Sequence, residues 1–418
     1  MAGSREIALS ELIGALSSAL DIGEGEPPGH AARSCLIGTR LADEISLDAF
    51  GADDQTAKRT SKLVDWARPV SAFMWSLKTV APDGSLSEKS ERLRAIRAEG
   101  HVTRSLMRAR CYRGADIARK LGFSEATAEA IRALDEHWDG NGQPHGLSGE
   151  DIPLAARIMC LAQTVEVFYT ARDAHIAYRV AAKRSGQWFD PALVTALGSL
   201  RNDHRFWQSL RSPDVSAVEP PDRVLTADED RLDLIAEGFA AVIDAKSPWT
   251  HEHCDRVRMI AVGMARVLGF DEPDLRELRR AALLHDIGKL SISNRILDKP
   301  GPLTEDERIR FQSHPLLTEQ ILARVPSFGG LAALASAHHE RLDGHGYPRG
   351  LTGDELTRSM RVLAVADVYE ALISDRPYRA AFSPRDALEL MSADVPSGLD
   401  PEVFAALKSV VFVAPAGF

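Results

Sequence analysis

Apolar residues recur at helical spacing in the second half of the chain. Two stretches share steps of three and four positions: Leu232, Ile235, Phe239 and Val242, then Val257, Ile260, Met264 and Val267. This spacing places apolar side chains on one face of an α-helix, and Gly269 suits the position just after a helix end. No alternating run is long enough for a half-buried strand. The pattern therefore predicts an all-α protein.

The helical pattern is interrupted between the two halves. The segment from Ser212 to Pro221 contains three prolines and no apolar periodicity, which is typical of a linker. A length of 418 residues favours two or three domains over one. We expect a first domain over residues 1–211, a linker over 212–228 and a second domain over 229–418.

Composition and charge indicate an ordinary folded protein. Hydrophobic residues make up 44% and charged residues 26%, and the net charge of -10 gives no global attraction to DNA or anionic membranes. The four cysteines (Cys35, Cys111, Cys160 and Cys254) form no C-x-x-C pair, which argues against disulfides and thiolate zinc sites. No signal-peptide or membrane-span pattern is visible. We expect a cytoplasmic protein without DNA or membrane partners.

One segment rich in Asp, Gly and Pro occurs in both halves. Residues 136–149 align without gaps on residues 340–353, at a constant offset of 204, and share the Asp-Gly-x-Gly-x-Pro spacing. We interpret this similarity as a sign that both halves derive from one helical domain type.

The second half is also rich in histidine. Seven of the thirteen histidines lie between residues 251 and 345, which suggests a metal site, although a lone histidine is more often a surface or satisfied core residue. His285-Asp286 and His338-His339 are adjacent pairs, and neighbours on one helix point about 100° apart. They could ligate together only at a helix end, or by serving different metals. Such pairs suit a dinuclear centre bridged by Asp286.

The spacing of these residues resembles a known family. Residues 283–290 read Leu-Leu-His-Asp-Ile-Gly-Lys-Leu, and residues 338–348 fit the pattern HHExxDGxGYP in full. These two segments resemble the HD-GYP family of metal-dependent phosphohydrolases. The resemblance runs from about residue 229 to the end of the chain.

The resemblance implies a helical bundle with seven metal ligands: His253, His285, Asp286, His314, His338, His339 and Asp367. Five imidazoles and two carboxylates suit iron, manganese, cobalt or nickel, and the family mostly uses iron or manganese. Some members hold a third metal through a carboxylate one helical turn before the first histidine. Trp249 stands at that position here, so we expect two metal ions.

The resemblance also implies an activity. The family opens cyclic di-GMP to linear pGpG and often cuts it further to GMP, with two metal ions that activate a water and clamp the phosphoryl oxygens. Asp286 and Lys289 are the expected catalytic residues. The residues at the family's substrate-contacting positions are Lys289, Tyr347, Arg376 and Arg379.

Each of these substrate contacts also has a purely structural explanation. Lys289 could complement a helix end, Tyr347 could cap a turn, and Arg376 could pair with Glu370, which stands where Asp is usual in the family. His251 and His345 match no ligand position, and we interpret both as surface residues.

The first half lacks the ligands of the second. At the offset of 204, the two adjacent histidines become Leu134 and Asp135, and the last carboxylate becomes Gln163. His30 resembles the first ligand, but no His-Asp pair follows it before Leu134. We predict a degenerate copy of the same domain that holds no dinuclear site and serves to regulate or to form a homodimer.

Three functions remain open. The first is a cyclic di-GMP phosphodiesterase, and the second is a phosphohydrolase of another cyclic dinucleotide or nucleotide. The third is a non-catalytic scaffold, because the resemblance implies diguanylate cyclase domains as partners of the Gly-Tyr-Pro loop. The complete ligand set speaks against a scaffold alone.

Overall fold

The structure is a computed structural model, and it describes residues 7–8, 33–34, 37, 108, 111–112, 114–120, 122–212, 226–244, 246–247, 249, 252–325 and 328–413. The chain divides into two compact units. The C-terminal unit comprises Met1–Gly23 with Val224–Phe418, and the N-terminal unit comprises Glu24–Arg223. The sequence instead predicted a domain over residues 1–211. Of the predicted linker, residues 213–225 lie outside the described residues.

The described residues are overwhelmingly helical, which confirms the predicted all-α fold. The strands in this part of the chain are β1 (Ile7–Ala8) and β2 (Thr226–Ala227), two residues each, which pair antiparallel with Ile7 opposite Ala227. None of the described helices combines the length and apolar character that crossing a membrane requires.

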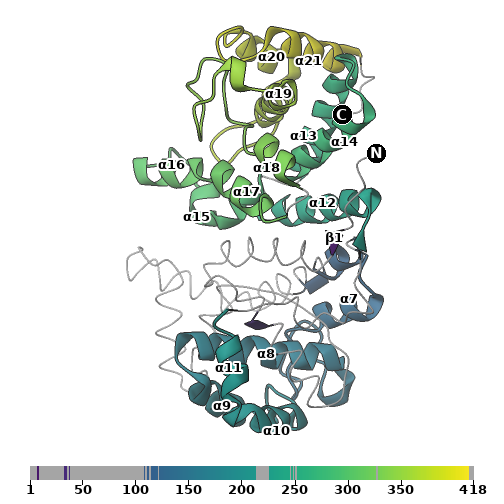
Figure 1. Cartoon of the computed structure of the whole chain (residues 1–418), viewed down its shortest axis with the longest axis vertical. Coiled ribbons are helices and arrows are strands. Elements are labelled where there is room, and N and C mark those ends of the chain that lie inside the picture. The colour runs from purple at the N-terminus through teal and green to yellow at the C-terminus, as the bar shows by residue number, and fades with distance from the viewer. Residues whose placement is uncertain are drawn as a thin grey trace. The chain divides into compact units, whose positions relative to one another are not determined.

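The C-terminal unit is a bundle around helix α13 (Figure 1). Its helices are α12 (Glu229–Asp244), α13 (His253–Val267), α14 (Glu272–Leu284), η5 (Ile287–Ser291), α15 (Asn294–Leu297), α16 (Glu305–Gln312), α17 (His314–Leu322), α18 (Gly329–Ala335), η7 (Gly353–Glu355), α19 (Arg358–Ile373), α20 (Pro384–Ser392) and α21 (Pro401–Val413). Helix α13 packs against α14, α19 and α21. Its apolar stripe supplies fully buried Val257 and Met264, so α13 lies in the core and its first residue starts inside the bundle.

The end of α13 follows from its sequence. Gly269 has φ +78°, its N–H bonds the carbonyl of Arg266, and the N–H of Phe270 bonds the carbonyl of Ala265, which is the glycine-ended C-terminal motif that the sequence predicted. Val267, predicted on the apolar stripe, is instead 56% exposed. It is the last residue of α13, so no further turn covers it.

The described helices of the N-terminal unit pack around α8. They are α7 (Glu125–Arg132), η1 (Gly149–Asp151), α8 (Leu154–Ala171), α9 (Ala174–Lys183), α10 (Pro191–Ser199), η2 (Leu200–Asn202) and α11 (His204–Ser209). Helix α8 is buried along most of its length, and Leu161 and Val165 join Leu197 and Trp207 in the main apolar cluster.

The segment repeated in sequence shares an internal hydrogen-bond pattern in both units: a buried glutamate accepts from the backbone N–H groups of the loop that follows it. The buried carboxylate of Glu136 accepts from the backbone N–H groups of residues 145, 146 and 147 at 2.6–3.0 Å. The buried carboxylate of Glu340 accepts from those of residues 349 and 351 at 2.8 and 2.9 Å. A Cβ on Gly142 would lie 2.4 Å from the Cα of Glu136, and one on Gly346 would lie 2.5 Å from that of Glu340. Both loops therefore need glycine there.

Candidate metal centre

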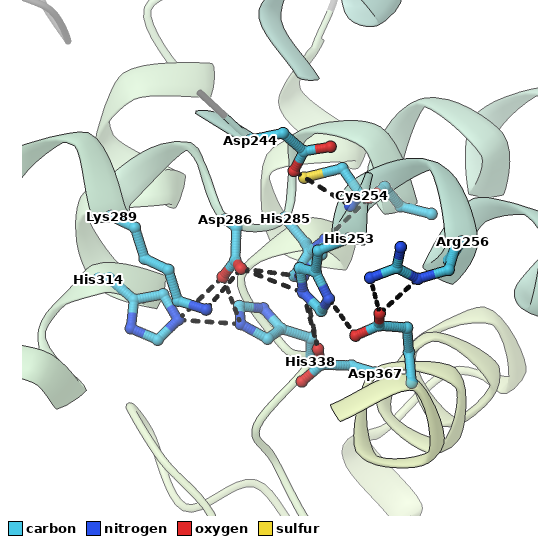
Figure 2. A network of polar contacts seen from close by, with 12 residues as sticks. Asp244, His253, Cys254, Arg256, His285, Asp286, Lys289, His314, His338 and Asp367 are labelled. Atoms are coloured by element: carbon cyan, nitrogen blue, oxygen red, sulfur yellow. Dashed lines mark hydrogen bonds and ion pairs between the residues drawn. The ribbon is translucent and has the colours of Figure 1, made fainter. Parts of the chain in front are cut away.

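All seven predicted ligands come together inside the C-terminal unit, and all of them except His339 are labelled in Figure 2. Most of them lie at helix ends: His253 begins α13, His285 and Asp286 follow α14, His314 begins α17, His338 and His339 follow α18, and Asp367 lies within α19. Six of the seven are at most 5% exposed, and His339 is partly exposed. The bundle thus surrounds a polar cluster with apolar helices.

The pair His285-Asp286 shows why a helix end is needed. Helix α14 ends at Leu284 and the 3₁₀ helix η5 begins at Ile287, so the two residues lie at the junction. Both side chains belong to one ligand set with His338, whereas neighbours inside a regular helix point about 100° apart.

Asp286 lies between two groups of histidines. Its Oδ2 atom is 3.3 Å from His253 Nε2 and 3.4 Å from His285 Nε2. Its Oδ1 atom is 3.3 Å from His314 Nε2 and 3.6 Å from His338 Nε2. One carboxylate therefore faces two sets of nitrogen donors, as a bridging ligand would.

Three of the histidines have the same local hydrogen bond. The Nδ1 atoms of His285, His314 and His338 each lie 2.7–2.8 Å from the carbonyl oxygen three residues earlier. A carbonyl only accepts, so each Nδ1 carries a proton, and each Nε2 presents a lone pair when the ring is neutral. The helix ends thus set the tautomer that ligates metal through Nε2.

Several of the metal-ligating nitrogen and oxygen atoms have no suitable hydrogen-bond partner within the described part of the protein. Nε2 of His314 and Nε2 of His338 face each other at 3.1 Å, although both are acceptors when Nδ1 is protonated. The buried polar atoms without a hydrogen-bond partner include Nε2 of His253, His285 and His339 and Oδ1 of Asp286. Buried donors and acceptors are normally satisfied. The cluster therefore fits bound cations.

The ligand atoms fall into overlapping sets. His253, His285 and Asp367 form one set, and His314, His338 and His339 form another, each with its ligand atoms within 4.8 Å of one another. Asp286 joins His285 and His338 in a third, which connects the two.

Comparison with known proteins identifies the family. The HD-domain family model matches residues 85–193 and 238–403. The chain belongs to the HD-GYP family of HD-domain phosphohydrolases. Phosphohydrolases with this domain depend on metal ions, in agreement with the cluster.

Two relatives and one solved structure illustrate the activities for which similar proteins are named. The chain is 40% identical to "3'3'-cGAMP-specific phosphodiesterase 3" of Vibrio cholerae, over 97% of this chain and 95% of that protein. It is 39% identical to "Cyclic di-GMP phosphodiesterase response regulator RpfG" of Xanthomonas campestris, over 40% of this chain and 45% of that protein. A crystal structure of a cyclic GMP-AMP specific phosphodiesterase from V. cholerae matches with a TM-score of 0.64 and 36% identity, over 98% and 99% of the two chains.

Burial and neighbouring charges in the HD-GYP site favour the deprotonated, metal-binding form of several ligands. Burial alone would raise the pKa of Asp286, but the charges of Lys289 and His285 outweigh it and hold this pKa well below its ordinary value. Burial lowers the pKa of His339 to about 3 and that of His338 well below its ordinary value. Burial also disfavours charge on His285, but Asp286 opposes it and raises the pKa to about 9. Metal binding at His285 must therefore displace a proton.

Two predicted substrate contacts border the ligands. Lys289 Nζ lies 2.5 Å from Asp286 Oδ2, and its ammonium group stands 5.7 Å from the ring centroid of Phe311. The ring of Tyr347 lies 4.7 Å from that of His339. Burial raises the pKa of Tyr347, so its phenol stays a hydrogen-bond donor at neutral pH.

The two predicted arginines contact protein acceptors. Arg376 Nη2 lies 3.3 Å from Glu370 Oε2, in line with the structural alternative given above. The guanidinium of Arg379 donates to the carbonyls of Ala371 and Leu372 at the end of α19, and to that of its neighbour Ala380. Their contact with substrate stays a prediction.

The other histidines and Trp249 add little to the cluster. The side chain of His345 is 85% exposed, as expected for a surface residue, and His251 lies outside the described residues. Trp249 is 38% exposed. It offers no carboxylate for a third metal.

Sequence reasoning missed the role of Glu370. It is fully buried and contacts Nδ1 of His253. No local pattern indicated this contact, because the two residues are 117 positions apart in the sequence.

Proposed function

We propose that the C-terminal unit hydrolyses a cyclic dinucleotide with two bound metal ions, and that 3'3'-cGAMP is its preferred substrate. The buried cluster of seven ligands carries the proposal of metal-dependent hydrolysis. Similarity over nearly the whole chain to a protein named as 3'3'-cGAMP-specific supports the substrate. Cyclic di-GMP, which the sequence favoured, is the second candidate, because relatives named for that activity match about two-fifths of the chain.

Two metal ions would be held by the ligand sets described above. His253, His285 and Asp367 would hold one ion, His314, His338 and His339 the other, and Asp286 would contact both. When bound, such ions act as Lewis acids on the phosphoryl oxygens and lower the pKa of the attacking water. Iron or manganese suits these nitrogen and oxygen donors.

The chain's own residues would orient and neutralise the substrate. Lys289 provides a positive charge beside Asp286, where it can pair with a phosphate oxygen. The Tyr347 phenol, which is protonated at neutral pH, can donate a hydrogen bond to the dinucleotide. Lys289 is held by its contact with Asp286 and Tyr347 by its packing on His339 before substrate arrives, so less reorganisation is needed in the transition state.

We also propose that the N-terminal unit is a degenerate copy that regulates the active unit or forms a homodimer. The matching loops at Glu136 and Glu340 support a common origin. Leu134 and Gln163 occupy the positions of His338 and Asp367, and both are buried. A leucine cannot ligate metal, and a neutral glutamine cannot balance a cation's charge.

Parallel hydrolysis assays with the two candidate substrates test the proposal. The full chain, loaded with iron or manganese and analysed for metal content, is incubated separately with 3'3'-cGAMP and cyclic di-GMP, and the products are separated by chromatography. We expect kcat/KM for 3'3'-cGAMP to be at least about tenfold higher. Faster cleavage of cyclic di-GMP would contradict the proposed substrate preference. Cleavage of neither dinucleotide would contradict the proposed hydrolytic activity. His345→Ala, an exposed histidine outside the ligand sets, is the matched control.

A further inference from the structure

His253 differs from three of the other ligand histidines in how its ring is held. His285, His314 and His338 each donate Nδ1–H to a backbone carbonyl three residues earlier. His253 is the first residue of α13 and follows Glu252, which has the left-handed φ of 59°. Its Nδ1 atom contacts Glu370 Oε2, from a residue 117 positions away on α19. A carboxylate thus takes the place of the missing carbonyl.

The carboxylate of Glu370 is itself fixed by several donors. Its Oε1 atom accepts from Arg256 Nε at 2.7 Å and from Ser374 Oγ at 2.6 Å. Its Oε2 atom, which faces His253, also lies 3.3 Å from Arg376 Nη2. Glu370 is fully buried, so water does not replace these contacts. Helices α13 and α19 are joined by this group directly behind the first ligand.

We propose that Glu370 is a positioning residue for metal binding. Its carboxylate accepts the Nδ1 proton of His253 and turns Nε2 toward Asp286 and Asp367, from which Nε2 lies 3.3 Å in both cases. Arg256 and Ser374 hold the carboxylate in place. This inference rests on the proposed metal-dependent hydrolysis. It assigns the orientation of the first ligand to a residue that touches neither metal nor substrate.

The N-terminal unit contains a close match to this group. Arg33 Nε donates to Glu166 Oε1 at 2.7 Å, and Thr170 Oγ1 contacts the same oxygen at 2.7 Å. Glu166 is fully buried, and Glu166 and Thr170 lie 204 positions before Glu370 and Ser374. His30, which would correspond to His253, lies outside the described residues. Because Leu134 and Gln163 stand at two ligand positions in this unit, a change at Glu166 is a matched control for the loss of a buried carboxylate.

The test compares Glu370→Gln, Glu370→Asp and Glu166→Gln in the full chain. Metals per chain are measured after dialysis against buffered free manganese, along with kcat, KM and the unfolding temperature of the metal-free protein. We expect Glu370→Gln to reduce metal content from two ions to about one and kcat by about 10- to 100-fold. Glu370→Asp, which keeps the charge, should restore the second ion. Glu166→Gln should lower the metal-free unfolding temperature but keep two ions.

Several outcomes would overturn the assignment. Two ions and near-parental kcat in Glu370→Gln would do so, and so would an equal loss of metal in Glu166→Gln, since that loss would reflect general destabilisation. If Glu370→Gln does not fold, Ser374→Ala removes one hydrogen bond to Glu370 without removing charge. We expect about threefold weaker manganese binding in that variant, against unchanged binding in Thr170→Ala, and equal affinity in the two would contradict the role. If the parent protein binds two ions but cleaves no cyclic dinucleotide, the proposed function fails while the metal measurements still test Glu370.

Discussion

The loops that follow Glu136 and Glu340 have the same hydrogen-bond pattern, yet their surroundings differ. Near Glu340, the preceding two residues are histidines of the ligand cluster, whereas Leu134 and Asp135 precede Glu136. Among the described residues, the groups that could hold a metal ion all lie in the C-terminal unit. The loop therefore does not depend on metal ligands. A buried carboxylate that satisfies two or three backbone N–H groups is sufficient to hold it.

The two Arg–Glu groups lead to the same conclusion. Glu166 and Glu370 are both fully buried, and each carboxylate has a 2.7 Å contact with an arginine, Arg33 or Arg256. Removing one partner of such a pair leaves an uncompensated buried charge, so the pair can be kept for stability in either unit. In the C-terminal unit, the carboxylate of Glu370 also contacts His253, so the pair there borders the ligand cluster.

The largest expected effect comes from removing the carboxylate that faces both histidine groups. Asp286→Ala should abolish hydrolysis, with at least about a 1,000-fold loss in rate, because several kcal/mol of electrostatic stabilisation depend on it. The variant should also lose at least one metal ion, measured by elemental analysis. Gln163→Ala, a change of similar size in the N-terminal unit, should keep the metal content. Activity of Asp286→Ala within tenfold of the parent would contradict the bridging role.

Metal removal should lower the stability of the C-terminal unit and leave that of the N-terminal unit unchanged. A chelator should remove two ions per chain, abolish hydrolysis and destabilise the protein by about 2.7 kcal/mol per ion, or about 5 kcal/mol in all, relative to metal at 100 times its Kd. Calorimetry should place the shift in the transition of the C-terminal unit. Substitution of Leu134 or Gln163 by alanine should not change its size. Three ions per chain, or one ion after saturating manganese, would contradict the two-ion centre.

Lys289→Ala should have a smaller effect. Its ammonium group is held beside Asp286 but is not a ligand, so we expect about a 10- to 100-fold lower kcat with both ions retained. Lys408→Ala, on α21 away from the ligand sets, should leave kcat unchanged. Loss of a metal ion in Lys289→Ala would show that the lysine stabilises the cluster and not the reaction.

Much of the site was predictable because its ligands lie in short sequence patterns. The His285-Asp286 pair and the two histidines before the Gly-Tyr-Pro loop stood out as adjacent pairs, and the resemblance to the HD-GYP family implied their role as ligands. The role of Glu370 could not, since its contact with His253 exists only after α13 and α19 pack together. The exposure of Val267 was also missed, because helical periodicity does not show where neighbouring helices end. Local patterns thus predicted the elements and the ligands, while tertiary packing determined their partners.

The smallest effect should distinguish the two loops. Glu136→Gln and Glu340→Gln each weaken acceptance from buried backbone N–H groups, so each should destabilise the protein by about 1–3 kcal/mol in urea unfolding. Only the second loop is tied to a ligand, because the N–H of Tyr347 bonds the carbonyl of His339 at 3.1 Å. We therefore expect Glu340→Gln to lower kcat by about tenfold, a typical effect for a residue that supports a ligand. Glu136→Gln should leave kcat within twofold of the parent. Equal changes in kcat would mean that both loops affect the site only through overall stability. The Glu340 loop would then have no specific role in supporting His339.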